Sequence, residues 1–339
     1  MIEEKIPVII DTDPGDDDAV AILWVLANSR FDVKACTVGY GNAGTEKCVC
    51  NMLRILEVAG RTDIPVYAGA HRPLLGRAEN AAWIHGEDGL GDAGFPLPDA
   101  QPAPGYAPVE MIRHAKESKE PVTLLCLSPV TNVALAYLLD PTFKDHVREV
   151  LIMGGAVRVP GNASPGASAN LKNDPWAAQI VYRSGMRVVQ LGLDTCNKMT
   201  ELDEDWAALE AAKTPVTDFI IRMLRFRREQ AVRVITDQAG NVRRLSQAEE
   251  MPDHAGGIGL NDVAATAYLI EPNWFKTREV YIDIDADSLC PGRTVPDMHG
   301  LWGKAPNARL AYDVDGRAAV DRLMSDLIAF RPRNGRVYS

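Results

Sequence analysis

The feature that most constrains the fold is the alternation of short apolar runs with helical patterns along the chain. Helical patterns, for example over 16–27 and 45–59, follow runs rich in β-branched residues, namely IPVIID (6–11), DVKACTVG (32–39), VTLLCLS (122–128), REVLIMGG (148–155) and RVVQLGLD (187–194). Strands of parallel sheets read in this way, because helices bury both of their faces. The sequence therefore predicts an α/β fold with a mostly parallel open sheet and helices on both faces.

The pattern changes near the C-terminus. From about Glu279 to Tyr312, the stretches EVYIDIDADS, GRTVPDM and NARLAYDV alternate apolar and polar residues. This alternation predicts a small antiparallel addition, followed by a last helix over 316–330. Since no stretch rich in Pro, Gly or Ser divides the chain of 339 residues, a single domain over 1–339 is expected.

Charge and hydropathy exclude some partners. The formal net charge of −10 gives no global basic field for nucleic acid. The first residues, MIEEKIPVIID, show no long apolar stretch behind a basic end. We therefore expect no membrane partner and a cytoplasmic location.

Five aspartates lie together directly after the first apolar run: Asp11, Asp13, Asp16, Asp17 and Asp18. A solvated acidic turn with a helix cap would explain one or two of them, and the spacing fits neither an EF-hand loop nor a Walker loop. A divalent cation such as Ca²⁺, which binds several oxygens, would convert the repulsion among these carboxylates into attraction. Asp262, which opens an apolar helix, is a candidate for a further ligand.

Polar loops follow the other predicted strands as well. YGN with Asn42, SPVTN, the long segment AVRVPGNASPGASANLKNDP and TCNKMT each come after an apolar run. In open α/β sheets ligands bind outside the carboxyl ends of the strands. These loops are therefore expected to gather around one site at that edge.

The motifs carry a resemblance to a known family. DTDPGDDDAVAIL, VGYGN, HGEDGLG, SPVTNVALA, LIMGGA, GNASPGASANLKNDPWAA and NDVAATAYLIEP, in this order over about 6–272, resemble the inosine–uridine preferring nucleoside hydrolases. The resemblance implies an α/β fold with a tightly bound Ca²⁺ at the strand ends. It also implies hydrolysis of the N-glycosidic bond of a ribonucleoside to ribose and free base.

The resemblance also implies roles for single residues. Asp13 would bind Ca²⁺ and take a proton from the attacking water, and His85 would border the base. The calcium ligands would be Asp13, Asp18, Asp262 and the main-chain carbonyl of Leu127. The substrate-binding residues would be Asp17, Asn42, Met153, Asn162, Asn170 and Asp262. Asp11 would support Asp13 without touching the ion, and Asp16, at a variable position, would only add charge at the helix N-terminus.

The sequence departs from the family at Asn261. Many members carry a His there that protonates the leaving base, whereas an amide can donate a hydrogen bond but cannot transfer a proton. The alternatives are His85, His254, stacking of the base on Phe226 or Trp83, and a base that leaves already activated.

A second departure is Ser168, where the family usually has a Glu that holds the 5′-hydroxyl of the ribose. It leaves open whether one hydrogen bond is simply lost or the 5′ end of the substrate is modified, with Arg158 or Lys172 nearby. Two rival functions follow: hydrolysis of an unusual N-riboside, suggested by both departures, and Ca²⁺-dependent binding of ribose or a nucleoside without turnover, suggested by the missing His.

The resemblance places a flap over the active site at 222–259, a stretch with seven arginines and no lysine over 222–250. The plain interpretation is a solvated helix and loop; a functional one is contact of an arginine with an anionic or carbonyl-rich substrate. A homodimer or homotetramer is also implied.

Overall fold

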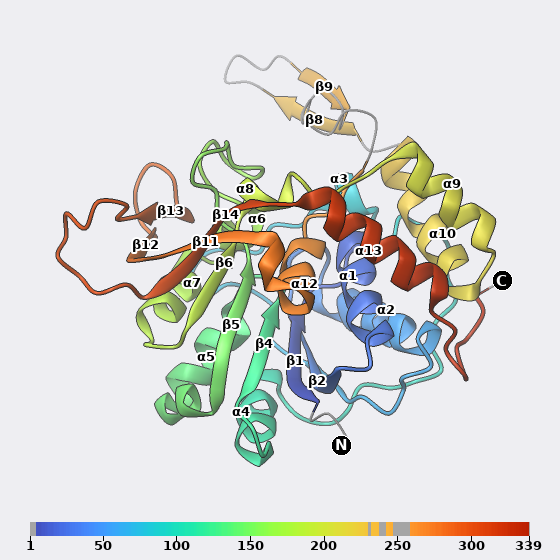
Figure 1. Cartoon of the computed structure of the whole chain (residues 1–339), viewed down its shortest axis with the longest axis horizontal. Helices are drawn as coiled ribbons and strands as arrows, with labels where there is room; N and C mark the ends of the chain where they lie inside the picture. Colours follow the sequence, from blue (N-terminus) through green and yellow to red (C-terminus); the bar gives the residue numbers. More distant parts are fainter. Residues whose placement is uncertain (1–4, 230–231, 237–241, 247–257, 339) are drawn as a thin grey trace.

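A computed structural model describes residues 5–229, 232–236, 242–246 and 258–338. Its centre is an eight-stranded sheet in the order β11-β14-β6-β5-β4-β1-β2-β3 (Figure 1). All neighbouring strands are parallel except β11 and β14. The strands are β1 (Ile6–Thr12), β2 (Phe31–Val38), β3 (Val66–Ala68), β4 (Val122–Cys126), β5 (Val147–Met153), β6 (Val188–Leu191), β11 (Phe275–Val280) and β14 (Ala308–Val314).

Helices cover both faces of this sheet. One face packs against α1 (Asp16–Ala27), α2 (Thr45–Val58), α8 (Leu193–Cys196), α9 (Asp203–Ala212), α10 (Pro215–Glu229), α12 (Val263–Ile270) and α13 (Gly316–Ala329). The other face packs against α4 (Ala107–Glu117), α5 (Thr131–Leu139), α7 (Pro175–Arg183) and the 3₁₀ helix η1 (Pro141–His146). Short helices lie in the connections: α3 (Ala82–His85), α6 (Ala169–Asn173) and η3 (Pro272–Trp274). The predicted α/β class and the two covered faces are confirmed.

The hydrophobic core explains why these runs became strands. Val8 and Ile10 of β1 lie in the core on the side of α1, whereas Ile9 lies in the core on the side of α5. Alternate side chains of a strand point to opposite faces, so a central strand needs apolar residues at every position. The near-continuous hydrophobicity of the run is the consequence.

The C-terminal part is only partly antiparallel. β11 pairs antiparallel with β14, and β12 (Ile282–Asp285) pairs antiparallel with β13 (Arg293–Pro296) in a separate two-stranded sheet. β14, however, lies parallel to β6 and so extends the main sheet. The expected antiparallel addition is found in these two pairs, whereas the parallel contact of β14 with β6 was not predicted, since alternation along a strand does not reveal the direction of its neighbour.

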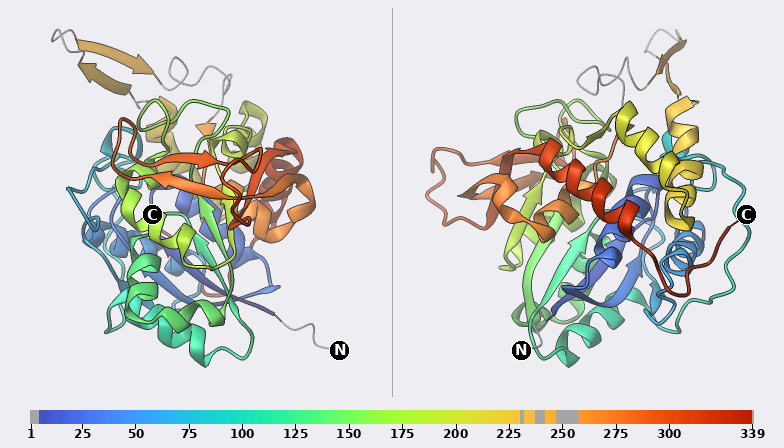
Figure 2. Two further views of the ribbon diagram at one scale, coloured as in Figure 1. Left: turned by 90° about the vertical axis from the view of Figure 1, so that its left-hand side faces the viewer. Right: turned by 45° about the vertical axis from the view of Figure 1, so that its right-hand side comes forward.

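Two further strand pairs are short: β7 (Thr200–Glu201) with β10 (Ile258–Gly259), and β8 (Val232–Thr236) with β9 (Val242–Ser246). The β8–β9 hairpin projects from the body beyond α3 and α10 (Figures 1 and 2). It belongs to the insert expected over 222–259, of which 230–231, 237–241 and 247–257 lie outside the described residues. Among the described helices, none is long and apolar enough to cross a membrane.

Candidate active site

The aspartate cluster is buried at the carboxyl edge of the sheet. Asp13 follows β1, and Asp16, Asp17 and Asp18 form the first turn of α1. All four are at least 95% buried. Carboxylates at a helix N-terminus are favoured by the helix dipole, but this one interaction cannot compensate for burying so many like charges. The simple acidic turn is therefore not what the structure shows.

Asp18 is held by neighbours from two strand ends. Its oxygens accept hydrogen bonds from the Thr12 hydroxyl (2.6 Å), the Gly15 amide (3.0 Å) and the Asn42 side chain (2.8 Å). The backbone amide of Asn42 also donates a hydrogen bond to Asp13 Oδ2 at 2.8 Å. The loop after β2 therefore fixes two carboxylates of the loop after β1.

Gly41 makes this arrangement possible. Its φ of +154° is rarely adopted by residues with a side chain, and a Cβ built there would lie 1.7 Å from Asp13 Oδ2. The absence of a side chain at Gly41 therefore lets the loop after β2 approach Asp13.

Asp17, Asp18 and Asp262 form a group in which one carboxylate oxygen of each residue lies within 4.8 Å of the others. Burial, followed by the charge of Asp17, raises the pKa of Asp18 to about 6. Burial and the charges of Asp18 and Asp17 raise the pKa of Asp262 well above its usual range. Such a set of hard oxygen ligands fits a divalent cation, which would remove the mutual repulsion.

Asp13 lies beside this group. Burial, then the charge of Asp18, raises the pKa of Asp13 well above its ordinary value. Its Oδ1 is buried and has no hydrogen-bond partner among the described residues, whereas Oδ2 accepts from Asn42. A buried carboxylate oxygen without a partner costs stability unless an ion or a substrate supplies the missing partner. Asp13 and the cation group thus meet the requirements of a metal-assisted hydrolytic site.

The cluster opens into a cavity of about 410 Å³, which is the size of many small-molecule sites. Of the residues predicted for the substrate, Asp13, Asp17, Asn42, His85, Asn162, Asn170 and Asn261 line it. Met153, Ser168 and Asp262 are not among the lining residues. The Ser168 hydroxyl instead accepts a hydrogen bond from the Gly155 amide at 2.7 Å.

The remaining predicted residues lie close to the cavity wall. The Leu127 carbonyl, predicted as a calcium ligand, accepts a hydrogen bond from Asn170 Nδ2 at 2.7 Å, and Met153 Sδ lies 3.2 Å from the same nitrogen. Asp11 accepts hydrogen bonds from Thr37 and Asn132, and burial raises its pKa to about 6. It therefore lies within the sheet beneath the site.

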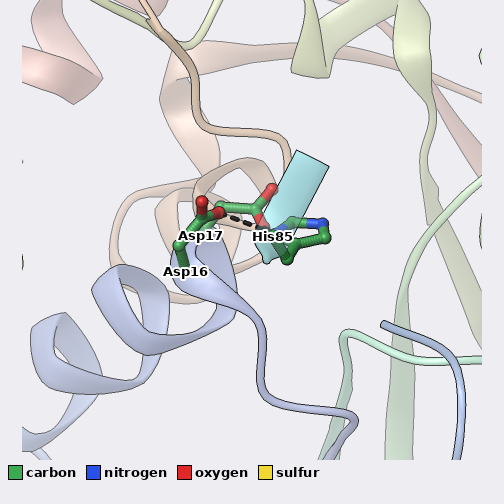
Figure 3. Close-up of side chains that lie close together, drawn as sticks. All are labelled: Asp16, Asp17 and His85. Atoms are coloured by element: carbon green, nitrogen blue, oxygen red, sulfur yellow. Dashed lines mark hydrogen bonds and ion pairs between the residues drawn. The ribbon is translucent and has the colours of Figure 1, made fainter. Parts of the chain in front are cut away.

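Asp16 has a larger role than the helix-terminal charge expected of it. It is fully buried, and its Oδ1 lies 2.9 Å from His85 Nδ1 and 3.0 Å from Arg227 Nη1. Figure 3 shows the imidazole of His85, from α3, beside the carboxylates of Asp16 and Asp17. Burial alone would lower the pKa of His85, but the charge of Asp16 and the hydrogen bond with it outweigh burial and raise that pKa.

Arg227, from α10, was not singled out from the sequence. It lines the cavity although it is only 3% exposed. In the sequence, the run of arginines over 222–250 and an aspartate without an assigned role, Asp16, were the only signals of this contact. No local pattern connects the two. Of the suggested platforms for the base, Trp83 lines the cavity and Phe226 does not; His254 lies outside the described residues.

This fold and site define an N-glycosyl hydrolase of the nucleoside hydrolase class. The sequence profile of the inosine-uridine preferring nucleoside hydrolases matches residues 8–321, and the chain belongs to this family. It is 36% identical over 326 residues to the pyrimidine-specific ribonucleoside hydrolase RihA of Escherichia coli, covering 96% of this chain and 99% of the relative.

Solved structures agree with this assignment. A plant nucleoside hydrolase, PpNRh1, matches with a TM-score of 0.86 and 31% identity, covering 96% of this chain and 99% of the other. A purine-preferring ribonucleoside hydrolase from Gardnerella vaginalis matches with the same TM-score and 26% identity, covering 96% and 98%. The resemblance expected from the motifs is confirmed.

Proposed function

We propose that the chain hydrolyses the N-glycosidic bond of ribonucleosides with the help of Ca²⁺, giving ribose and free base, and that Asp13 is the general base. The observation that carries this proposal is the unpartnered Oδ1 of Asp13 beside the group formed by Asp17, Asp18 and Asp262. Asp13, Asp18, Asp262 and the Leu127 carbonyl would hold the ion. Bound there, Ca²⁺ supplies a fixed positive charge that lowers the pKa of water and orients the sugar diol.

The chain's own residues then divide the work. Asp17, Asn42, Asn162 and Asn170 hold the ribose hydroxyls from one wall of the cavity. Asp13 accepts the proton of the water that attacks C1′, a contribution typically worth about 10²–10⁴-fold. The transition state resembles an oxocarbenium ion, and the buried carboxylates stabilise its positive charge.

We assign the wall that faces the leaving base to Trp83, His85, Arg227 and Asn261, which line the same cavity. The names of relatives do not settle which base is preferred, because RihA is named pyrimidine-specific and the Gardnerella enzyme purine-preferring. The groups that line this wall must therefore decide the preference. The buried hydroxyl of Ser168, bound to Gly155, leaves the 5′ end of the ribose without the partner that the family provides.

A substrate panel tests the proposal. Uridine, cytidine, inosine, adenosine, guanosine and 5′-altered ribosides are incubated with protein and Ca²⁺, and free base and ribose are measured by chromatography. Release of both in equal amounts from at least one nucleoside is expected. Binding of nucleosides by calorimetry without release from any of them would contradict the proposal and favour a binding protein. The homodimer or homotetramer remains a prediction, which light scattering tests.

A further inference from the structure

Arg227 belongs to the cavity lining and has a hydrogen-bond donor without a partner among the described residues. Its Nη1 donates to Asp16 at 3.0 Å, but its Nε is buried and has no partner among the described residues. The side chain is only 2% exposed, yet it forms part of the cavity wall. A buried N–H group without a partner is costly, so a ligand group that accepts a hydrogen bond would be stabilised there.

Arg227 lies close to residues that the proposed function assigns to the sugar and to the base. Its Nη1 lies 3.8 Å from Asp17 Oδ2, on the residue assigned to the ribose. It lines the same cavity as His85 and Asn261, which the proposed function assigns to the base. Asp16 contacts both His85 and Arg227, and therefore fixes their positions relative to the sugar.

The chemistry of this wall favours a base that leaves as an anion. A guanidinium group stays protonated and does not transfer its proton, but it stabilises negative charge on an oxygen by charge-assisted hydrogen bonds. Asn261 likewise donates no proton. In a pyrimidine riboside, a carbonyl adjoins the glycosidic nitrogen and shares the electron pair of the departing base. A purine leaving from N9 has no carbonyl on the neighbouring carbons.

We propose that Arg227 stabilises the leaving base of pyrimidine ribonucleosides by hydrogen bonding to the carbonyl oxygen beside the glycosidic nitrogen, with Asp16 as its positioning residue. The C1′–N bond breaks with its electron pair on the base, and the water oxygen bonds to C1′ as Asp13 takes the water proton. The base anion and Asp13 afterwards exchange protons with solvent. This inference rests on the proposed function and adds its leaving-group chemistry and its substrate class.

The test compares leaving groups in Arg227→Met and in the matched control Arg225→Met. Arg225 lies two residues earlier on α10, and its side chain is 55% exposed. The substrates are uridine, 5-fluorouridine and 5-methyluridine, together with inosine and the riboside of 4-nitrophenol, whose leaving group is already activated. Loss of one buried donor to a developing oxyanion typically costs about 10²–10³-fold in rate.

For Arg227→Met we expect a loss of that size in kcat/KM for uridine, and less than about tenfold for inosine and the nitrophenyl riboside. Among the uridines, the loss should be smallest for the most acidic base, 5-fluorouracil. Arg225→Met should change no substrate by more than about twofold. An equal loss of Arg227→Met on every substrate would overturn the inference and assign Arg227 a structural role.

Two further measurements keep the inference testable. Removing one member of a buried ion pair destabilises more than replacing both, so Asp16→Asn/Arg227→Gln provides a neutral pair if Arg227→Met does not fold. This double variant should show the same selective loss; wild-type uridine hydrolysis in it would overturn the inference. If the wild-type protein hydrolyses none of these ribosides, the proposed function itself fails, whatever the variants do.

Discussion

The backbone amide of Asn42 donates a hydrogen bond of 2.8 Å to Asp13 Oδ2, whereas the other oxygen of this carboxylate, Oδ1, is buried without a partner in the described part of the chain. The contact fixes the carboxylate by one oxygen and leaves the other without a protein partner among the described residues. It is the geometry that a general base requires, because a positioned acceptor must be free to take a proton.

Asp13→Asn should therefore lose turnover and keep the fold. The amide oxygen can still accept from Asn42, but it cannot take a proton, so kcat on the best nucleoside should fall by at least about 10²–10⁴-fold. Since the charges of Asp18 and Asp17 oppose ionisation of Asp13, the variant should melt no lower than wild type in chelator at pH 7.5. Near-normal kcat would contradict the assignment of the base.

Gly41→Ala should damage the site more than the fold. A Cβ would lie 1.7 Å from Asp13 Oδ2, so the carboxylate must move. A displacement of about 1 Å can cost about 10²-fold in rate, which steady-state kinetics would detect. Gly76→Ala is the matched control, since Gly76 also has a positive φ, +93°, but has no atom within 4 Å of such a Cβ. An equal loss of activity in both variants would speak against the contact with Asp13.

Stabilisation by Ca²⁺ should grow as pH rises. The folded-state pKa of Asp18 is raised from 3.8 to about 6. Without the ion, this carboxylate therefore favours folding when protonated and costs stability as pH rises from about 4 through 6. At higher pH the ion, which needs the ionised form, replaces the proton.

Calorimetric melting with Ca²⁺ and with chelator, from pH 5 to pH 8, checks this dependence. At free Ca²⁺ of about 100 times Kd, the gain near pH 7.5 should be about 2.7 kcal/mol. It should shrink towards pH 5, where protons compete with the ion. A melting-temperature gain from Ca²⁺ that is the same at every pH would contradict the role of Asp18 as a ligand.

Asn261→His should add little to pyrimidine hydrolysis. If Arg227 already stabilises the departing base, a new acid at position 261 should change kcat/KM for uridine by less than about tenfold. General acid catalysis contributes its usual factor of about 10²–10⁴ only where no other group stabilises the leaving base. Kinetics with uridine and inosine in parallel checks this. A gain of about 10²-fold on uridine would show that the missing His limits the enzyme.

The fold could be predicted from the sequence where local patterns decide it. The helix expected over 16–27 is found at Asp16–Ala27, and the apolar runs became the central strands, because burial on both faces leaves a direct pattern. The direction of β14 could not be predicted. Its alternation shows a half-buried strand, but only the tertiary contact with β6 makes it parallel.

The candidate site was predictable where one motif carries it and hidden where distant segments meet. The loop after β1 holds the aspartates as a contiguous motif, so a cation site could be inferred. Asp16 and Arg227 are 211 residues apart, and no periodicity relates a helix N-terminus to an arginine on α10. The same holds for the Ser168 hydroxyl, whose bond to Gly155 only the packed loops reveal.

The proposed hydrolysis depends most on the ion at the aspartate cluster. The most direct measurement is the turnover of the best nucleoside by one protein sample before chelation, after removal of the metal, and after return of Ca²⁺. We predict that turnover is lost with the metal and is restored with Ca²⁺ in proportion to about one ion per chain. Undiminished turnover by metal-free protein would contradict the account.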